Sequence, residues 1–155
     1  MRRFLIVAHG TFAEGIFTAM GILTGMTENV TAINCFCEGA ERNPRERMEK
    51  FIEETPREDE IVILTDLFGG SVNNDASMLF RDLKRENLHI ITGVNLALAL
   101  ELLLYPDNEP LAQAIEAMIE QARDGMKYVN TYMEEIIARS ELATEQDDED
   151  FFDSL

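Results

Sequence analysis

The sequence has few thiol and imidazole side chains, the ligands of most zinc and redox-metal sites. It contains no tryptophan, two cysteines and two histidines among its 155 residues. Cys35 and Cys37 form a C-x-C pair, but the chain lacks the second Cys or His pair that a four-ligand zinc site needs. We therefore predict no metal and no cofactor, and we interpret the cysteines as small hydrophobic residues at a strand end in a reducing compartment.

Long apolar runs are also missing. No run approaches the roughly 20 apolar residues that are needed to cross a bilayer. The short apolar segment at the N-terminus ends at His9-Gly10 instead of continuing to a signal-peptide cleavage site. We expect a cytoplasmic protein whose first strand lies in this segment.

Basic residues are scarce. Lys and Arg number 13 against 30 Asp and Glu, which gives a formal net charge of −17. Such a charge repels the phosphate backbone that a nucleic-acid-binding protein must attract, so we expect no nucleic-acid partner.

The length and the distribution of charge predict one domain and a tail. A chain of 155 residues is of the size that folds around a single core. The region after Arg139 is rich in Glu, Asp and Gln and has few apolar residues, a composition typical of disorder. We predict a domain over residues 1–138 and an acidic, disordered tail over residues 139–155.

Four short apolar runs, rich in β-branched residues, alternate with segments of helical pattern. The runs are Phe4–Ala8, Val30–Phe36, Ile61–Thr65 and Leu88–Thr92. Runs that are apolar on both faces are typical of parallel strands covered by helices on either side, and crossovers between such strands are right-handed. The predicted fold class is α/β: one domain with a doubly wound, mainly parallel sheet, helices on both faces and the common strand order 2-1-3-4.

Helices are expected between and after these strands. Their predicted ranges are 11–25, 44–54, 71–84, 95–105 and a last helix from about Pro110. Thr11 and Ser71 are the predicted capping residues of the first and third helices, which places two helix N-termini just after the first and third strands.

Two polar residues end neighbouring strands of the predicted sheet. His9 ends the first strand and Asp66 ends the third, and ligands of doubly wound proteins gather at this edge, where the strand order reverses. We expect the imidazole and the carboxylate to meet. A carboxylate on one ring nitrogen fixes the tautomer and leaves the other nitrogen as a nucleophile, which is an arrangement suited to accepting a phosphoryl group. His89 lies near the start of its strand, at the opposite edge, and we assign it a structural or surface role.

Glycines and hydroxyls follow both of these strand ends. Gly69, Gly70 and Ser71 come before a predicted helix, as do Gly10 and Thr11. Backbone amides, a hydroxyl and a helix N-terminus together form a site for a phosphate group. We therefore predict that these five residues bind phosphate.

Three segments resemble one known family. They are Ile6-Val7-Ala8-His9-Gly10, then Leu64-Thr65-Asp66-Leu67-Phe68-Gly69-Gly70-Ser71, then Thr92-Gly93-Val94-Asn95-Leu96. In this order they resemble the mannose/fructose/sorbose family of IIA components (EIIA) of the bacterial phosphoenolpyruvate-dependent sugar phosphotransferase system. The resemblance covers residues 1 to about 130. Two family prolines are replaced here, by Val72 and Ala97, and neither replacement removes a chemical group.

The resemblance implies a function. A mannose-type IIA protein accepts a phosphoryl group from the phosphocarrier protein HPr and passes it to a IIB component, which serves a IIC/IID membrane permease, and such proteins usually form homodimers. By resemblance, His9 is the phosphorylated residue, Asp66 orients it, Ser71 and the glycines before it contact the phosphate, and Gly93 and Asn95 belong to the motif that closes the site.

Three alternative functions remain open from the sequence. The chain could be a regulatory module that senses the phosphorylation of His9, or a phosphotransfer subunit of a dihydroxyacetone kinase type system, or a flavodoxin-like module that binds a small ligand without covalent chemistry. A nucleotide-dependent kinase is not indicated, because the sequence has neither a G-x-x-x-x-G-K-[ST] loop nor a kinase-type glycine-rich loop.

Overall fold

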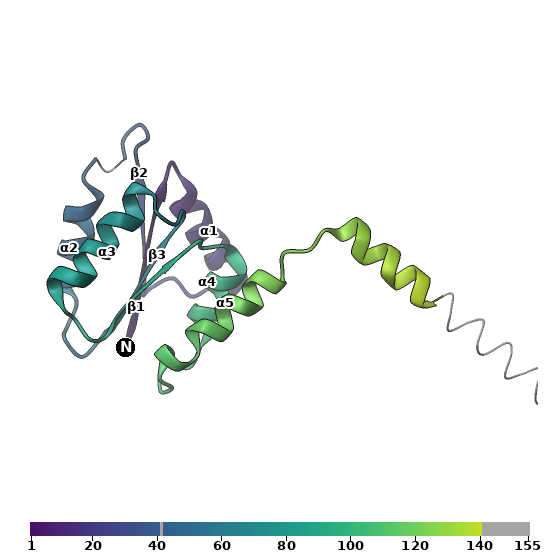
Figure 1. Cartoon of the computed structure of the whole chain (residues 1–155). Coiled ribbons are helices and arrows are strands. Elements are labelled where there is room, and N and C mark those ends of the chain that lie inside the picture. The colour runs from purple at the N-terminus through teal and green to yellow at the C-terminus, as the bar shows by residue number, and fades with distance from the viewer. Residues whose placement is uncertain (41, 141–155) are drawn as a thin grey trace, which may run out of the picture. The chain divides into compact units, whose positions relative to one another are not determined.

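The computed structural model describes residues 1–40 and 42–140. Its sheet consists of four strands, β1 (Arg2–His9), β2 (Val30–Cys35), β3 (Glu60–Thr65) and β4 (Leu88–Thr92). The strand order is β2-β1-β3-β4 and every neighbouring pair is parallel (Figure 1). The predicted α/β class, the parallel sheet and the strand order are confirmed.

Helices connect the strands and follow them. They are α1 (Phe12–Thr24), α2 (Pro44–Glu54), α3 (Ser71–Leu83), α4 (Leu96–Leu104), the 3-10 helix η1 (Leu111–Gln113) and α5 (Ile115–Asp124). The single helix predicted from Pro110 is wrong in this detail, because a 3-10 turn precedes α5. No described helix is both long enough and apolar enough to cross a membrane.

The chain divides into two compact units, of which the first is Met1–Ala122 and the second begins at Arg123. In the second unit, residues 129–140 are helical. Most of the predicted acidic tail, from residue 141 on, lies outside the described residues. The predicted boundary after residue 138 therefore stays a prediction.

Helices cover both faces of the sheet, and each face has its own hydrophobic core. Figure 1 shows α2 and α3 on one side and α1, α4 and α5 on the other. Phe4 and Ile6 of β1 face the α1 and α4 side, whereas Leu5 and Val7 face α2 and α3. All four side chains are buried, which explains why β1 reads as an uninterrupted apolar run.

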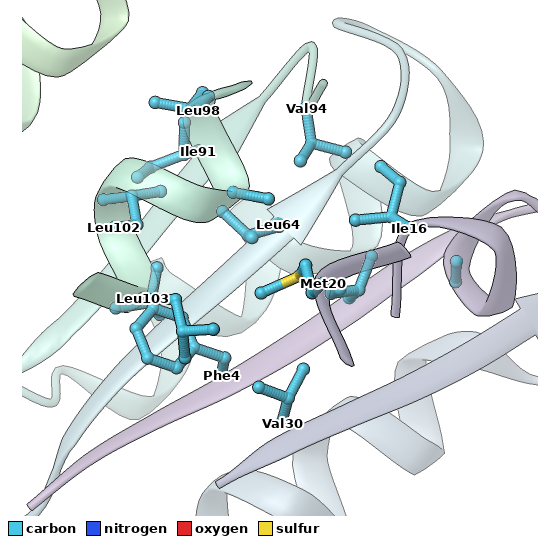
Figure 2. Close-up of a cluster of buried hydrophobic side chains, with 14 of the residues drawn as sticks. Phe4, Ile16, Met20, Val30, Leu64, Ile91, Val94, Leu98, Leu102 and Leu103 are labelled. Atoms are coloured by element: carbon cyan, nitrogen blue, oxygen red, sulfur yellow. The ribbon is translucent and has the colours of Figure 1, made fainter. Parts of the chain in front are cut away.

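The core beneath α1 and α4 is the larger of the two. Figure 2 shows Phe4 and Leu64 of the sheet with Met20 of α1 and Leu102 of α4 pointing into it. Each of these side chains is at most 1% exposed. Full burial of one such side chain contributes about 1.5–3 kcal/mol, so this core fixes α1 against the sheet.

Buried charges mark the end of the sheet opposite the strand carboxyl ends. Arg2 is 2% exposed, and its Nε donates to Glu60 Oε2 at 2.7 Å while its Nη1 donates to the carbonyl of Tyr105 at 2.9 Å. The other oxygen of Glu60 lies 3.0 Å from His89 Nε2. His89 thus takes part in a hydrogen-bond network that joins three strands, in agreement with the structural role predicted for it.

Candidate functional site

His9 and Asp66 meet at the carboxyl ends of β1 and β3. These strands are neighbours in the sheet, so their last residues lie side by side. Asp66 Oδ2 lies 2.8 Å from His9 Nδ1 and also accepts the backbone N–H of His9 at 2.8 Å. The His9 side chain is 41% exposed and that of Asp66 is 15% exposed. The contact expected from the sequence is present, and it leaves the imidazole accessible from outside.

The environment of Asp66 keeps its carboxyl group ionised. Burial raises the pKa of this carboxyl, but hydrogen bonds from the backbone and the ring of His9 and from the backbone N–H of Leu67 outweigh it, so the pKa lies below its ordinary value. Because an ionised carboxylate can only accept hydrogen bonds, His9 Nδ1 carries the proton that it donates to Asp66. This tautomer of His9 leaves the lone pair on Nε2.

The second ring nitrogen of His9 points toward the start of α3. Ser71 Oγ lies 3.4 Å from His9 Nε2. The predicted capping role of Ser71 is wrong. Gly70 is the N-cap residue of α3, and Ser71 is the first residue of the helix. The hydroxyl is therefore directed at the imidazole, next to the first-turn amides of α3, which have no partners within the helix.

The backbone amides of Gly69 and Gly70 donate hydrogen bonds within the protein. The N–H of Gly69 donates to Asn73 Oδ1 at 3.1 Å, and the N–H of Gly70 donates to the carbonyl of Leu67 at 3.1 Å. Both amides thus have acceptors within the protein, and the expectation that these glycines contact phosphate stays a prediction. A Cβ atom at position 70 would lie 3.1 Å from the oxygen of Leu67 and 3.6 Å from His9 Cε1, so glycine allows the loop to approach the imidazole.

The amide of Gly10 also has an acceptor within the protein, and its predicted contact with phosphate stays a prediction. Its N–H donates to the carbonyl of Cys35 at 2.8 Å, and its φ of 61° lies in the left-handed region that favours glycine. Gly10 therefore turns the chain from β1 into α1. Thr11 is the N-cap of α1 but makes no side-chain cap hydrogen bond, so the capping box predicted there is wrong.

A side chain from β2 does the capping that Thr11 does not. Asn34 Oδ1 accepts the N–H of Glu14 at 3.1 Å, and Asn34 Nδ2 donates to Glu14 Oε2 at 2.9 Å. Both side-chain groups of Asn34 thus hold the N-terminal turn of α1 beside the end of β2. Thr11 itself is exposed.

The loop after β4 forms another wall of the site. Gly93 has a φ of 73°, the N–H of Val94 donates to the carbonyl of Thr65 at 3.1 Å, and Asn95 Oδ1 accepts the N–H of Leu98 at 2.9 Å to cap α4. Gly93 and Asn95 thus position Val94, whose side chain lines the site.

Large apolar side chains surround His9, and the sequence analysis missed them as site residues. An open hollow of about 420 Å³ is lined by His9, Phe12, Asp66, Leu67 and Val94. Phe12 is 46% exposed and Leu67 is 62% exposed. Their positions in the sequence could have indicated this, because Phe12 lies three residues after His9 and Leu67 follows Asp66 directly.

An aromatic ring directly after β2 also contacts the imidazole. The rings of Phe36 and His9 have centroids 5.4 Å apart and planes inclined by 34°. Nothing in the sequence pattern distinguished Phe36 from an ordinary strand residue.

The side chains that could bind a metal ion do not form a cluster in the described part of the chain. Among the described residues, no group of three or more His, Cys, Asp or Glu side chains could hold a metal ion. Cys35 is buried, Cys37 is half-buried, and the two are not joined by a disulfide.

Comparisons with known proteins place the chain in one family and agree with the arrangement of its strands. Residues 3–122 match a family model described as the PTS system fructose IIA component. The fructose-specific EIIA component of Bacillus subtilis is 23% identical over 132 residues, which cover 85% of this chain and 89% of the relative. The mannose-specific EIIAB component of Escherichia coli is 32% identical over 127 residues, which cover 79% of this chain but only 38% of that longer protein.

Solved structures show the same fold. The EIIA component of Streptococcus agalactiae superimposes with a TM-score of 0.73 and 28% identity, over 84% of this chain and 99% of that structure. A PTS IIA protein associated with the fucose utilization operon of Streptococcus pneumoniae gives a TM-score of 0.69 and 29% identity, over 85% of this chain and 96% of that structure. The chain belongs to the family of fructose- and mannose-type IIA components of the sugar phosphotransferase system.

Proposed function

We propose that His9 is the phosphoryl carrier of this IIA component, accepting the group from HPr through Nε2 and passing it to a IIB component. The observation that carries the proposal is the 2.8 Å hydrogen bond between Asp66 Oδ2 and His9 Nδ1, which leaves Nε2 as the ring atom with an outward lone pair. The exposed imidazole is accessible to another protein.

In the accepting step, the Nε2 lone pair of His9 attacks the phosphorus atom of the donor phosphohistidine. The donor N–P bond breaks, its electron pair returns to the donor nitrogen, and a new N–P bond forms at Nε2. Because Nδ1 keeps its proton, positive charge develops on the ring, and the carboxylate of Asp66 stabilises it. The passing step follows the same course in reverse, with a cysteine or histidine of the IIB component as the acceptor.

The start of α3 is the proposed site for the oxygens of the phosphoryl group. Transfer of this group depends mainly on positioning and on stabilisation of its charge. The Ser71 hydroxyl lies 3.4 Å from Nε2, and the first-turn amides of α3 follow it with the positive end of the helix dipole. Thr11, at the N-cap of α1, is the proposed second donor.

The rim of the site favours a protein as the phosphoryl donor. Phe12, Phe36 and Leu67 are all large, apolar and at least 46% exposed. Exposed apolar side chains around an exposed reactive group are typical of a surface that another protein covers. A surface of this kind suits HPr and a IIB component, and the net charge of −17 would attract a basic partner.

We propose that the whole relay operates in the cytoplasm and ends at a IIC/IID permease, so that this chain never contacts the sugar. A homodimer is also proposed. Strand β4 is an edge of the sheet and Leu104 of α4 is 58% exposed, so this side of the molecule has apolar surface and backbone groups to offer a second copy. Sedimentation velocity of the full chain over a range of concentrations tests the dimer.

Phosphorylation in a reconstituted system tests the carrier role. The full chain is incubated with phosphoenolpyruvate, enzyme I and HPr, and intact mass is measured in conditions that preserve phosphohistidine. We expect one phosphoryl group on the wild type and on the matched control His89→Gln, and none on His9→Ala. Equal labelling of His9→Ala, or no label on the wild type, would contradict the proposal.

A chase distinguishes a relay from a regulatory module. The labelled protein is mixed with purified IIB proteins of the mannose family, and the label on each protein is followed over a single turnover. A relay loses its label to a IIB protein, whereas a module that only senses its own phosphorylation retains it.

A further inference from the structure

Phe36 has a backbone conformation that bulky residues rarely adopt. Its φ is 60°, and Lys84 is the other non-glycine residue with a positive φ in the part of the chain that is described. Lys84 ends α3, where a left-handed residue is common. Phe36 follows strand β2, where glycine would meet the same requirement without strain, so the phenyl ring needs another explanation.

Hydrophobic burial does not supply that explanation. The Phe36 side chain is 54% exposed, so more than half of its surface gains nothing from folding. The backbone before it is well fixed, because Cys35 pairs with His9 in the sheet and its carbonyl accepts the N–H of Gly10. The left-handed residue after this fixed point directs the ring toward the imidazole.

The ring completes a set of contacts around His9. Asp66 of the β3 end holds Nδ1 and Ser71 of α3 faces Nε2, while Phe36 of the β2 end lies against the imidazole with the centroids 5.4 Å apart. This separation is within the range of interacting aromatic pairs. The electron-rich face of a phenyl ring also attracts a positive charge beside it.

We infer that Phe36 is a positioning residue for His9, an inference that rests on the carrier role proposed above. The ring restricts rotation of the half-exposed imidazole, so that Nε2 stays directed at the incoming phosphorus. It also favours the positive charge that the imidazole acquires when Nε2 bonds to phosphorus while Nδ1 keeps its proton. The strained backbone of Phe36 is thus explained by the contact that its side chain makes with the imidazole of His9.

Phosphoramidate, a small phosphoryl donor, separates positioning from docking of a protein. Its P–N bond breaks as Nε2 attacks, the nitrogen leaves as ammonia, and no protein surface is involved. Loss of the phenyl ring in Phe36→Leu should slow labelling of His9 about 3- to 10-fold, as the loss of one weak interaction with a charged ring predicts. Phe36→Tyr should restore the rate, and the matched control Phe80→Leu, which changes an aromatic that is 53% exposed on α3, should label like the wild type.

Two further measurements do not depend on phosphorylation. In the NMR spectrum, the ring current of Phe36 should shift the imidazole protons of His9 in the wild type and in Phe36→Tyr but not in Phe36→Leu. In urea, Phe36→Gly should unfold at a higher concentration than Phe36→Ala, because glycine relieves the left-handed strain. Equal imidazole shifts in all variants, or a less stable Phe36→Gly, would overturn the inference.

The outcomes also separate this inference from the carrier role. If phosphoramidate labels His9 equally fast in the wild type and in Phe36→Leu, Phe36 does not position the imidazole, and slowing seen only with HPr as donor would assign the ring to docking instead. If neither donor labels His9 in the wild type, the carrier role fails and the inference fails with it.

Discussion

One oxygen of Asp66 accepts two hydrogen bonds from one residue, His9. Oδ2 lies 2.8 Å from the backbone nitrogen and 2.8 Å from Nδ1, while Oδ1 accepts the N–H of Leu67 at 2.9 Å. The carboxylate is thereby fixed by backbone groups of two strand ends, and its orientation does not depend on the imidazole alone. A single side chain thus holds both the backbone and the ring of the neighbouring strand end.

Asp66→Asn should change which ring nitrogen of His9 carries the proton. An amide at this position can donate to Nδ1, so the proton moves to Nε2 and the outward lone pair is lost. We expect phosphorylation by HPr to slow by about 100-fold or more, as for the loss of a proton-holding group in general. The initial rate of phosphohistidine formation measures this, with Asp75→Asn on α3 as the control. A rate within a few-fold of the wild type would contradict the role given to Asp66.

The same carboxylate should make stability depend on pH in the acid range. The pKa of Asp66 is lower in the folded protein than its ordinary value of 3.8, so the unfolded chain binds a proton more readily. Its contribution to stability is complete above the ordinary pKa and is lost as pH falls through the folded pKa. The free energy of unfolding, measured by urea denaturation between about pH 6 and about pH 3, should therefore fall less steeply in Asp66→Asn than in the wild type. Parallel curves would show that Asp66 is not stabilised by its hydrogen bonds to His9.

Gly70→Ala should damage both stability and transfer. Position 70 has a φ of −68°, which alanine accepts, but the new Cβ would lie 3.1 Å from the oxygen of Leu67 and 3.6 Å from His9 Cε1. Relief of this contact moves the loop or the imidazole, at a cost of about 1–3 kcal/mol in the free energy of unfolding. Urea denaturation and the rate of phosphorylation by HPr measure the two effects.

Gly15→Ala is the matched control for this change. Position 15 lies inside α1, and a Cβ there would meet no atom within 4 Å. Alanine should stabilise the helix by about 0.5–1 kcal/mol and leave phosphorylation unchanged. If both variants behaved alike, the close approach at position 70 would not matter.

The sequence predicted the elements that carry the chemistry better than it predicted how their polar atoms are used. His9 and Asp66 each end an apolar run, and the topology of parallel sheets then brings them to one edge. The partners of the Gly10, Gly69 and Gly70 amides could not be predicted, because their acceptors come from Cys35, Asn73 and Leu67 through local loop geometry. Such acceptors leave no periodic signal.

Two further features depend on tertiary structure alone. Phe36 adopts a left-handed backbone that its residue type disfavours, so no propensity indicates it. Arg2 and Arg85 are buried although arginine is normally exposed, and their acceptors are carboxylate and carbonyl oxygens distant in the sequence. Sequence patterning identifies which faces are apolar, but it does not identify which charges find buried partners.

Arg85 should be a stability residue with no role in transfer. It is 5% exposed, and its guanidinium donates to four backbone carbonyls, that of Ile52 in the last turn of α2 and those of Thr55, Pro56 and Asp59 between α2 and β3. Arg85→Met would remove all four hydrogen bonds, although the carbonyls of Pro56 and Asp59 would keep a second donor, and the loss should cost about 2–4 kcal/mol in the free energy of unfolding. Arg85→Lys should recover only part of this, because an ammonium group cannot copy the planar fork of donors.

The exposed Arg81, whose Nε is 2.9 Å from Asp82, provides the control: Arg81→Met should leave the urea midpoint essentially unchanged. Below its unfolding temperature, Arg85→Met should still accept phosphate from HPr at the wild-type rate, because the site lies at the other end of the sheet. A slow but fully folded Arg85→Met would show instead that the turn between α2 and β3 is coupled to His9.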